Sequence, residues 1–309
     1  MKNIVVLEKI EMTEEQVNRL RQLGNVKFYE TSSLEECKER VKDADVVVVD
    51  WLDPNGFLEN MKPNSLLALM STGYSWVDVK KARSLGISVA NIPGYAAEAV
   101  AEHLFGLILC VLRKIINSDY AVRKGKWEEG RFRVWELNGK TLGIIGLGRI
   151  GRRMAEIGQG FGMKVITYNR TPKNLPGVKE VGLQELLKES DVISINCDIN
   201  PTSRNLIGQK EFDLMKPTAI IVSATWDVIE LLALIDALKK KKIWGAGLDV
   251  AVEAVTEKFK LPEELLKLDN VVLTAHTAYN TQESQIRRVD ICIDNIESFL
   301  KGKPKNIVN

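Results

Sequence analysis

The sequence predicts an α/β fold with two doubly wound parallel-sheet domains, and three observations support this prediction. The chain has 309 residues, about twice the usual length of a single domain. Short apolar runs alternate with amphipathic segments from the first residue to about residue 280, as in stacked βαβ units. A long apolar stretch over about 96–124 interrupts this alternation and has no strand beside it. We expect this stretch to be one helix that crosses between the domains.

The first set of strands precedes this helix. Two of the segments between these strands begin with capping boxes, Thr13 to Gln16 and Ser33 to Glu36, which are typical helix starts. The expected strands are NIVVLE, VKFYE, DVVVVD, LLALMST and ISVANI.

The second set of strands follows the long helix and predicts a doubly wound sheet of six strands. After this sheet, the chain from about Gln285 is expected to form one helix, followed by KGKPKNIVN. The six expected strands are TLGIIG, KVITYN, DVISINC, AIIVSA, WGAGLDV and NVVLTAH.

The composition is that of an ordinary globular protein. Hydrophobic residues make up 45% and charged residues 27% of the chain, and the formal net charge is +2. This balance does not favour nucleic acid or a membrane as partner. The charged opening segment lacks a signal-peptide core, so we expect a cytoplasmic protein. The 4 cysteines have no CxxC spacing and there are only 2 histidines, so we expect no metal site and reduced, buried thiols.

A glycine-rich turn indicates a dinucleotide site. It reads Gly146-Leu147-Gly148-Arg149-Ile150-Gly151, directly follows the strand TLGIIG and leads into an expected helix over Arg152 to Phe161. Gly146 permits the tight turn, Gly148 lets the backbone approach a pyrophosphate, and Gly151 allows close packing of helix on strand. The unpaired N–H groups of the helix N-terminus would face the phosphates. The alternative is a turn of the same shape that binds no ligand.

No carboxylate follows the next strand, where a domain that prefers NAD has an Asp or Glu for the ribose 2′-hydroxyl. The residues there are Tyr168, Asn169, Arg170, Thr171, Pro172 and Lys173. An acid would repel a 2′-phosphate, whereas Arg170 can pair with it bidentately and Thr171 and Lys173 can add donors. NADP(H) is therefore the predicted cofactor and NAD(H) the alternative. The interpretation of Arg170 and Lys173 as solvated loop charges stays open.

With this turn in place, the chain resembles the D-isomer-specific 2-hydroxyacid dehydrogenase family over nearly its whole length. The resemblance implies a Rossmann dinucleotide-binding domain over 99–288, inserted in a flavodoxin-like substrate domain made of 1–98 and 289–309. The segments that carry it are LMSTGYSWVDVKKARSLGISVANIPGYAAEAVAEH, GKTLGIIGLGRIGRRMAE, GAGLDV, LTAH and FLKGKPKNIVN.

The resemblance also implies a reaction, in which hydride passes between the nicotinamide and C2 of a 2-oxo or 2-hydroxy acid or a related carbonyl. The backbone N–H groups of Ser71, Thr72 and Gly73 stand where the family binds the substrate carboxylate, and His276 matches its acid/base histidine. The other histidine, His103, lies in an apolar helix and is expected to be a packing residue. Around the nicotinamide, the resemblance assigns Asp249 to the amide and places Cys197, Ser223 and Thr225 at the border of the cofactor site.

The sequence departs from the family around this one pocket. Trp226 stands where the family has the arginine that clamps the carboxylate and polarises the ketone, and an indole offers one N–H and no charge. The catalytic glutamate falls on Ala254, so Glu253 would serve only in a shifted register. Trp226, with Trp51 and Trp76 on the facing loops, suggests a more aromatic pocket, and ordinary packing of these side chains is the alternative.

Three functions follow from these observations. The first is an NADP(H)-dependent oxidoreductase with an altered substrate, in which His276 is the acid/base. The second is a dinucleotide-binding sensor or scaffold without dehydrogenase activity. The third is an ordinary hydroxypyruvate or glyoxylate reductase, and the presence of Trp226 in place of the arginine argues against it. The segment WEEGRFRVWELNGK resembles the family's dimer-forming region, so a homodimer is implied.

Overall fold

The computed structural model describes residues 1–127, 129–173, 175–250 and 261–309, and the chain forms two compact units. Unit 1 comprises Met1–Ala96 and Asn280–Asn309, and unit 2 comprises Ala97–Tyr279. The chain returns to unit 1 at Asn280 and not at the expected residue 289. The reason is that the last helix contacts unit 1 from its first turns: Gln16 Nε2 donates to the Ile286 carbonyl at 3.0 Å, and Arg288 pairs with Asp50, whose side chain is 10% exposed.

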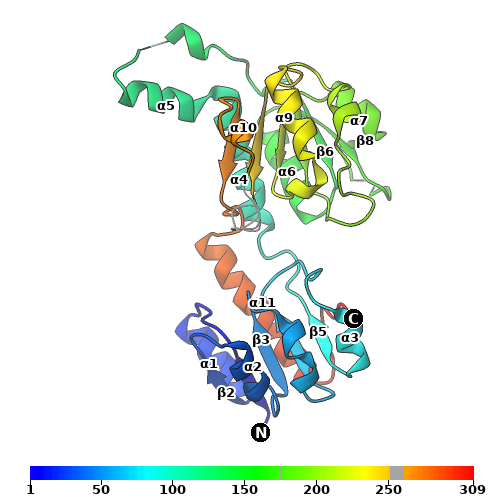
Figure 1. The fold of residues 1–309 in the computed structure, drawn as a ribbon. Coiled ribbons are helices and arrows are strands. Elements are labelled where there is room, and N and C mark those ends of the chain that lie inside the picture. Colours follow the sequence, from blue (N-terminus) through cyan, green and yellow to red (C-terminus); the bar gives the residue numbers. More distant parts are fainter. Residues whose placement is uncertain (128, 174, 251–260) are drawn as a thin grey trace. The chain divides into compact units, whose positions relative to one another are not determined.

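Unit 1 is a five-stranded parallel sheet in the order β2-β1-β3-β4-β5, the strand order of flavodoxin-like folds (Figure 1). The five expected strands and both capping boxes are confirmed. Its elements are β1 (Asn3–Val6), α1 (Glu14–Leu23), β2 (Asn25–Phe28), α2 (Leu34–Arg40), β3 (Val46–Val49), η1 (Pro54–Gly56), η2 (Leu58–Asn60), β4 (Leu66–Leu69), α3 (Val79–Ser84), β5 (Ser88–Ala90) and α11 (Gln282–Leu300). Every residue of β3 and β4 is buried, as expected for central strands covered on both faces.

Unit 2 is a seven-stranded parallel sheet in the order β12-β11-β10-β9-β6-β7-β8, the doubly wound order of a Rossmann domain. The expected six strands are present, and β8 was not expected because its 2 residues are too short to show a periodic pattern. The strands are β6 (Thr141–Ile145), β7 (Lys164–Tyr168), β8 (Lys179–Glu180), β9 (Val192–Ile195), β10 (Ile220–Ser223), β11 (Gly245–Asp249) and β12 (Val271–Thr274).

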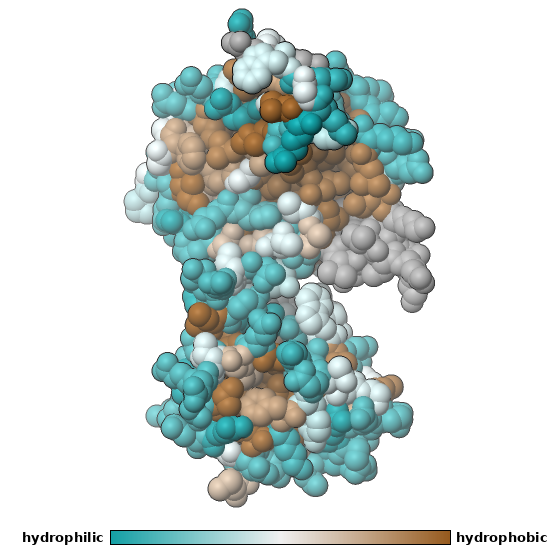
Figure 2. Space-filling view, turned by 90° about the vertical axis from the view of Figure 1, so that its left-hand side faces the viewer, coloured by the Kyte–Doolittle hydropathy of each residue, from teal (hydrophilic) through white to brown (hydrophobic). Residues whose placement is uncertain are grey.

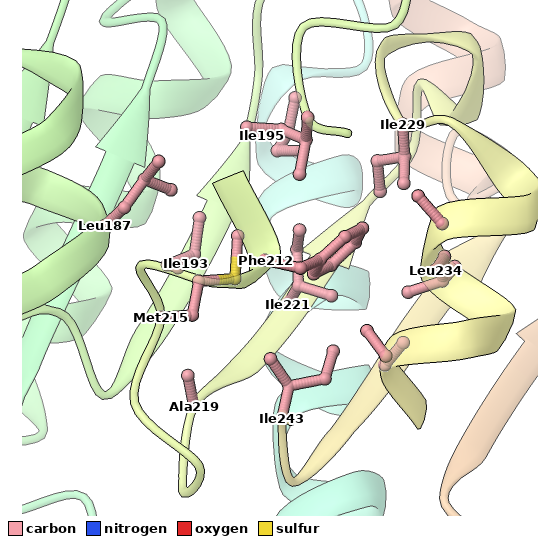
Figure 3. Close-up of a cluster of buried hydrophobic side chains, with 14 of the residues drawn as sticks. Leu187, Ile193, Ile195, Phe212, Met215, Ala219, Ile221, Ile229, Leu234 and Ile243 are labelled. Carbon is pink, nitrogen blue, oxygen red and sulfur yellow. The ribbon is translucent and has the colours of Figure 1, made fainter. Parts of the chain in front are cut away.

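Helices cover both faces of this sheet. The helices of unit 2 as a whole are α4 (Ala97–Arg113), α5 (Ile115–Arg123), η3 (Glu129–Phe132), α6 (Arg149–Gly160), α7 (Leu183–Glu189), α8 (Gln209–Phe212), η4 (Trp226–Val228), α9 (Leu231–Lys239) and α10 (Glu263–Leu266). Phe212, Ile221 and Leu234 belong to a buried apolar cluster between α8, α9 and one face of the sheet (Figure 3).

Strand β11 shows how closely α4 approaches the other face. A Cβ on Gly245 would lie 2.6 Å from Val111 of α4, and one on Gly247 would lie 2.8 Å from Leu107. The intervening Ala246 points to the opposite face and packs in the cluster with α9, because side chains alternate along a strand. The glycines of GAGLDV therefore let α4 lie directly on the sheet.

The single helix expected over 96–124 is broken. Lys114 adopts φ 50, so α4 ends at Arg113 and α5 begins at Ile115. One residue in the left-handed region cannot continue a right-handed helix. As a result α5 leaves the body of unit 2 as a projecting arm (Figure 1).

Among the described helices, none is long and apolar enough to cross a membrane. The described residues likewise contain no group of three or more His, Cys, Asp or Glu side chains arranged to hold a metal ion.

Candidate active site

The predicted cofactor residues lie at the carboxyl edge of the unit 2 sheet. Gly146 follows β6, Asn169 follows β7, and Cys197 follows β9. Strands of a parallel sheet end at the same edge, and ligands of doubly wound folds bind outside that edge. The structure therefore brings these separate segments together.

Two glycines of the turn are required by the chain itself. Gly146 has φ +95, and its Cβ would lie 2.7 Å from the Cys197 backbone nitrogen. A Cβ on Gly151 would lie 2.2 Å from the Gly146 carbonyl oxygen. The turn and the close approach of α6 to the sheet thus depend on both glycines, as predicted.

Gly148 is different, because neither its backbone nor its packing requires glycine. It has φ −79 and ψ −159, and a Cβ there would meet no atom of the described chain within 4 Å. Helix α6 begins at Arg149, three residues before the expected start, and no side chain of the described residues caps it. Its first N–H groups, with those of Arg149 and Ile150 among them, thus remain free to bind an anion. The open space beside Gly148 and this uncapped N-terminus fit a pyrophosphate.

The turn after β7, where the sequence predicts the ribose contact, is joined to the glycine turn. Asn169 Oδ1 accepts from the Leu147 N–H at 2.6 Å, and Asn169 Nδ2 donates to Glu180 Oε1 at 3.3 Å. Glu180 Oε2 also accepts from the Lys173 N–H at 3.1 Å. The sequence contains no acid directly after β7, but β8 supplies one to the turn. Glu180 was missed because nothing in its local pattern predicts β8.

Arg170, Thr171 and Lys173 are exposed, in keeping with a surface that could receive a phosphate. Arg170 Nη1 donates to Thr202 Oγ1 at 3.1 Å. In the part of the chain that the structure describes, no carboxylate pairs with Arg170, so its charge is not neutralised. The interpretation as a solvated loop charge therefore stays open for Lys173. It fits Arg170 less well, because Thr202 holds the Arg170 side chain.

Three further residues stand at this edge near the ends of β9 and β10. Burial raises the pKa of the Cys197 thiol, so this side chain stays protonated at neutral pH. Ser223 is fully buried, and its Oγ accepts from the Thr225 N–H at 2.9 Å and donates to the Thr225 carbonyl at 2.9 Å. These two hydrogen bonds between Ser223 and Thr225 fix the direction of the chain after β10. Their assignment to the nicotinamide border stays a prediction.

His276 follows β12 at the same edge and has a strained backbone. Its φ is 53, a left-handed conformation that L-residues other than glycine adopt at a cost of about 1–2 kcal/mol. Its Nδ1 is buried and has no hydrogen-bond partner among the described residues. The imidazole tilts against Tyr279, with ring centroids 5.4 Å apart. An imidazole with one buried, unpaired nitrogen is suited to proton exchange with a ligand.

Asp249 holds the turn that carries His276. It is 1% exposed, and its Oδ1 accepts from Thr274 Oγ1 at 2.6 Å and from the Thr277 N–H at 2.9 Å. Its Oδ2 accepts from the Ala278 N–H at 2.9 Å. The carboxylate therefore bonds the chain on both sides of His276. Its predicted contact with a nicotinamide amide stays a prediction.

His103 is not only the packing residue that the sequence indicated. From α4, its Nε2 lies 2.8 Å from Thr274 Oγ1 and 3.8 Å from Asp249 Oδ1. The apolar neighbours of His103 in the sequence hid this polar contact, because Thr274 is 171 residues away along the chain.

The altered positions are only in part described. Trp226 begins η4 three residues after β10 ends at Ser223, so the backbone of the residue predicted to replace the family's arginine lies at this edge. Its neighbour Asp227 pairs with Arg204 at 3.1 Å. Glu253 and Ala254 lie outside the described residues.

Unit 1 carries the predicted carboxylate-binding loop after β4. Ser71 Oγ donates to the Gly73 carbonyl at 2.7 Å, and Thr72 Oγ1 donates to the Ile92 carbonyl at 2.9 Å. Among the described residues, none accepts from the backbone N–H groups of Ser71, Thr72 and Gly73. Three adjacent unpaired donors form a site that fits a carboxylate.

Two tryptophans of unit 1 were expected at the pocket, Trp76 just after this loop and Trp51 after β3. Trp76 Nε1 donates to the Gly73 carbonyl at 3.1 Å, which ties its indole to the loop. Trp51 exposes 62% of its surface, so ordinary packing does not account for it.

Comparison with known proteins agrees with this geometry. Residues 105–278 match the family model described as D-isomer specific 2-hydroxyacid dehydrogenase, NAD binding domain. A glyoxylate reductase of Thermococcus litoralis is 38% identical, with 92% of this chain and 91% of that protein covered. A hydroxypyruvate reductase of Blautia hydrogenotrophica is 35% identical, with 94% of each covered.

Among solved structures, an acyclic imino acid reductase in complex with NADPH and D-Arg superposes with a TM-score of 0.89 at 32% identity, and each chain is covered fully. The named relatives are reductases, and the match extends over both units. The chain therefore belongs to the D-isomer specific 2-hydroxyacid dehydrogenase family of oxidoreductases.

Proposed function

We propose that the protein is an NADP(H)-dependent reductase that acts on the carbon next to the carboxylate of a 2-oxo acid or a related compound. One observation carries this proposal: the carboxyl edge of one sheet holds both the glycine turn, with the uncapped N-terminus of α6, and His276, whose buried Nδ1 has no partner among the described residues. The bound cofactor would supply the hydride. A sensor without activity would not need an acid/base group at this edge.

The protein's own residues would perform the remaining tasks. The free N–H groups of Ser71, Thr72 and Gly73 would bind the substrate carboxylate and fix its orientation. With an oxo acid, His276 would donate a proton to the ketone oxygen, which gains negative charge as hydride arrives at carbon. With an imine, it would donate the proton that gives the nitrogen its positive charge before hydride arrives.

NADP(H) is the proposed cofactor. The uncompensated Arg170 and the neutral Asn169 favour a 2′-phosphate, since phosphate and guanidinium pair through parallel N–H···O bonds. The acyclic imino acid reductase, whose structure contains NADPH, supports the same choice. Glu180 acts against it electrostatically, but both its oxygens already accept hydrogen bonds from the turn.

Trp226 favours a second candidate substrate class, the 2-imino acids. A neutral ketone needs a nearby cation to stabilise the developing alkoxide, and an indole offers none. A protonated imine carries its own positive charge, so its carbon accepts hydride without that cation, and an arginine beside it would repel it. The likeness to an imino acid reductase supports this alternative within the same site.

One assay series tests both candidates. Consumption of NADPH and of NADH would be followed with glyoxylate, hydroxypyruvate and larger 2-oxo acids, each with and without ammonium or methylamine. Turnover that requires the amine identifies an imine substrate, and turnover without it identifies the oxo acid. His276→Asn should remove most turnover and leave NADPH binding intact, as measured by nicotinamide fluorescence. Tight NADPH binding with no turnover on any of these compounds would overturn the proposal.

We further propose a homodimer. The projecting arm exposes large apolar side chains, and Figure 2, which faces the side from which the arm leaves, shows hydrophobic surface on unit 2 around it. Such exposed apolar surface is unusual for a monomer. The large exposed apolar side chains of α5 are Ile115, Ile116, Tyr120 and Val122, and Trp127, just after this helix, is exposed as well.

A further inference from the structure

We propose that His103 is a positioning residue, which holds His276 in place through Thr274 and Asp249. This inference rests on the proposed function for the role of His276, whereas the contacts themselves do not. All four residues belong to unit 2 and to its described part. No step of the proposed reaction touches His103 directly.

The hydrogen bonds determine which nitrogen of His103 carries a proton. Thr274 Oγ1 has a single proton, and at 2.6 Å from Asp249 Oδ1 it donates that proton to the carboxylate. The same oxygen lies 2.8 Å from His103 Nε2 and can only accept there. His103 Nε2 must therefore be protonated and donate. The chain of bonds runs in one direction, from His103 through Thr274 to Asp249.

This chain of bonds ends on the carboxylate that shapes the turn of His276. Asp249 accepts from the backbone N–H groups of Thr277 and Ala278, each at 2.9 Å, directly after the strained His276. A strained conformation persists only where surrounding contacts hold it. Donation from His103 fixes the rotamer of Thr274 and so keeps Asp249 Oδ1 directed at the Thr277 N–H.

Charge supports the same role. Asp249 is 1% exposed, and a buried carboxylate requires compensating donors or a counter-charge. Among the described residues, His103 is the one side chain that can place a positive charge within 4 Å of Asp249, at 3.8 Å. A plain packing residue would not need its polar atom at this place, and a phenyl ring would fill the same space on α4.

The presence of only 2 histidines permits a direct spectroscopic test. In the full chain labelled with ¹⁵N, imidazole correlation spectra contain two ring systems, and His276→Asn identifies each of them. The variants are His103→Phe, which keeps a ring and removes the donor, His103→Gln, which keeps an N–H donor of similar reach, and Thr274→Val, which removes the hydroxyl. Glu102→Gln on the exposed neighbour is the control.

We expect His103 to show the Nε2-protonated tautomer, and the His276 resonances to shift in His103→Phe and in Thr274→Val but not in the control. With a substrate in hand, His103→Phe and Thr274→Val should each lower kcat about tenfold at nearly unchanged KM and NADPH affinity, because each removes one hydrogen bond from the chain of bonds that ends on Asp249. His103→Gln should restore kcat to within about threefold. The double variant should cost no more than either single one, because both remove the same chain of bonds.

Two results would overturn the proposal. One is a His103 protonated at Nδ1 alone, and the other is an unchanged His276 spectrum in both His103→Phe and Thr274→Val. A protein that shows the expected spectra but reduces no substrate would contradict the proposed function and leave the positioning role standing, so the two failures are distinguishable.

Discussion

Gly148 and Gly151 lie three residues apart in the phosphate-binding turn, yet different partners require them. A Cβ placed on Gly151 would lie 2.2 Å from the Gly146 carbonyl oxygen of the same turn. A Cβ on Gly148 would meet no atom of the described chain within 4 Å. Gly151 is therefore required by the fold, whereas the proposed role of Gly148 is to let a ligand approach the backbone.

We predict opposite consequences for alanine at these positions. Gly151→Ala should lower the free energy of unfolding by about 1–3 kcal/mol, the usual range for an overpacked site. Gly148→Ala should leave the unfolding free energy within about 0.5 kcal/mol and weaken NADPH binding at least about tenfold. Thermal denaturation and fluorescence titration measure the two effects. Normal NADPH affinity in Gly148→Ala would contradict the role assigned to this glycine.

Arg170 provides the residue-scale test of cofactor choice. Arg170→Ala should weaken NADPH binding about tenfold or more, because a hydrogen bond between charged groups is worth about 1.5–3 kcal/mol, and should leave NADH binding nearly unchanged. Lys164→Ala, at the other end of β7 and exposed as well, is the matched control. Equal loss of both cofactors in Arg170→Ala would mean that this side chain does not recognise the 2′-phosphate.

For single residues, the sequence is sufficient to predict a position where the local backbone conformation requires one residue type. The three glycines and Asn169 could be placed because their neighbours in the chain define the turn. Glu180 and His103 could not, because Asn169 meets Glu180 across 11 residues and His103 meets Thr274 across 171. Partners that meet only after folding leave no local pattern.

Among the elements, the start of β3 depends on one carboxylate. Asp45 precedes β3 and accepts from the Asn3 N–H at 2.7 Å, from Lys62 at 3.0 Å and from Lys2 at 3.2 Å. Burial alone would raise the pKa of Asp45, but the Asn3 N–H and the two lysines outweigh it and hold the pKa below the ordinary value. The ionised carboxylate therefore stabilises the junction of β1 and β3.

This shift gives a pH dependence with a definite sign. A carboxyl group with a lowered folded pKa contributes stability that is present above its unfolded pKa of about 3.9 and is lost as the pH falls through the folded value. Asp45→Asn should therefore lower the unfolding free energy by about 1 kcal/mol at pH 7 and by progressively less below about pH 4. Urea denaturation at several pH values measures this. A difference between variant and native protein that grows on acidification would contradict the assignment.

The elements also show where periodicity is informative. Strands such as VVVV of β3 and LLAL of β4 are buried runs bounded by polar residues, and they were correctly predicted. The break at Lys114 was not, since a lysine gives no signal for a left-handed backbone and the apolar pattern continues across it. The direction that α5 takes is thus a property of the fold and not of its local sequence.

For the molecule as a whole, unit 2 lies in the chain between the two segments of unit 1, an arrangement that the resemblance to the family implied and that strand patterns alone do not give. The second boundary was misplaced because the pattern of α11 does not reveal which unit it covers. Contacts from Gln16 and Asp50 assign the helix to unit 1. Whether copies of the chain associate is likewise decided by surfaces, which a periodic pattern does not describe.

The projecting arm supplies a test of association. Ile116 and Tyr120 are 52% and 64% exposed and, four residues apart in α5, lie on the same side of the helix. The native protein should have twice the mass of one chain in light scattering, and its melting temperature should rise with concentration. Ile116→Glu combined with Tyr120→Glu should give a monomer that melts at a concentration-independent temperature, since buried like charges oppose association. Leu232→Glu, on an apolar residue of α9 that is 72% exposed, should remain dimeric.

A native protein with the mass of a single chain at micromolar concentration would refute the homodimer. Loss of the dimer in both the arm variant and Leu232→Glu would mean that the arm is not its specific contact.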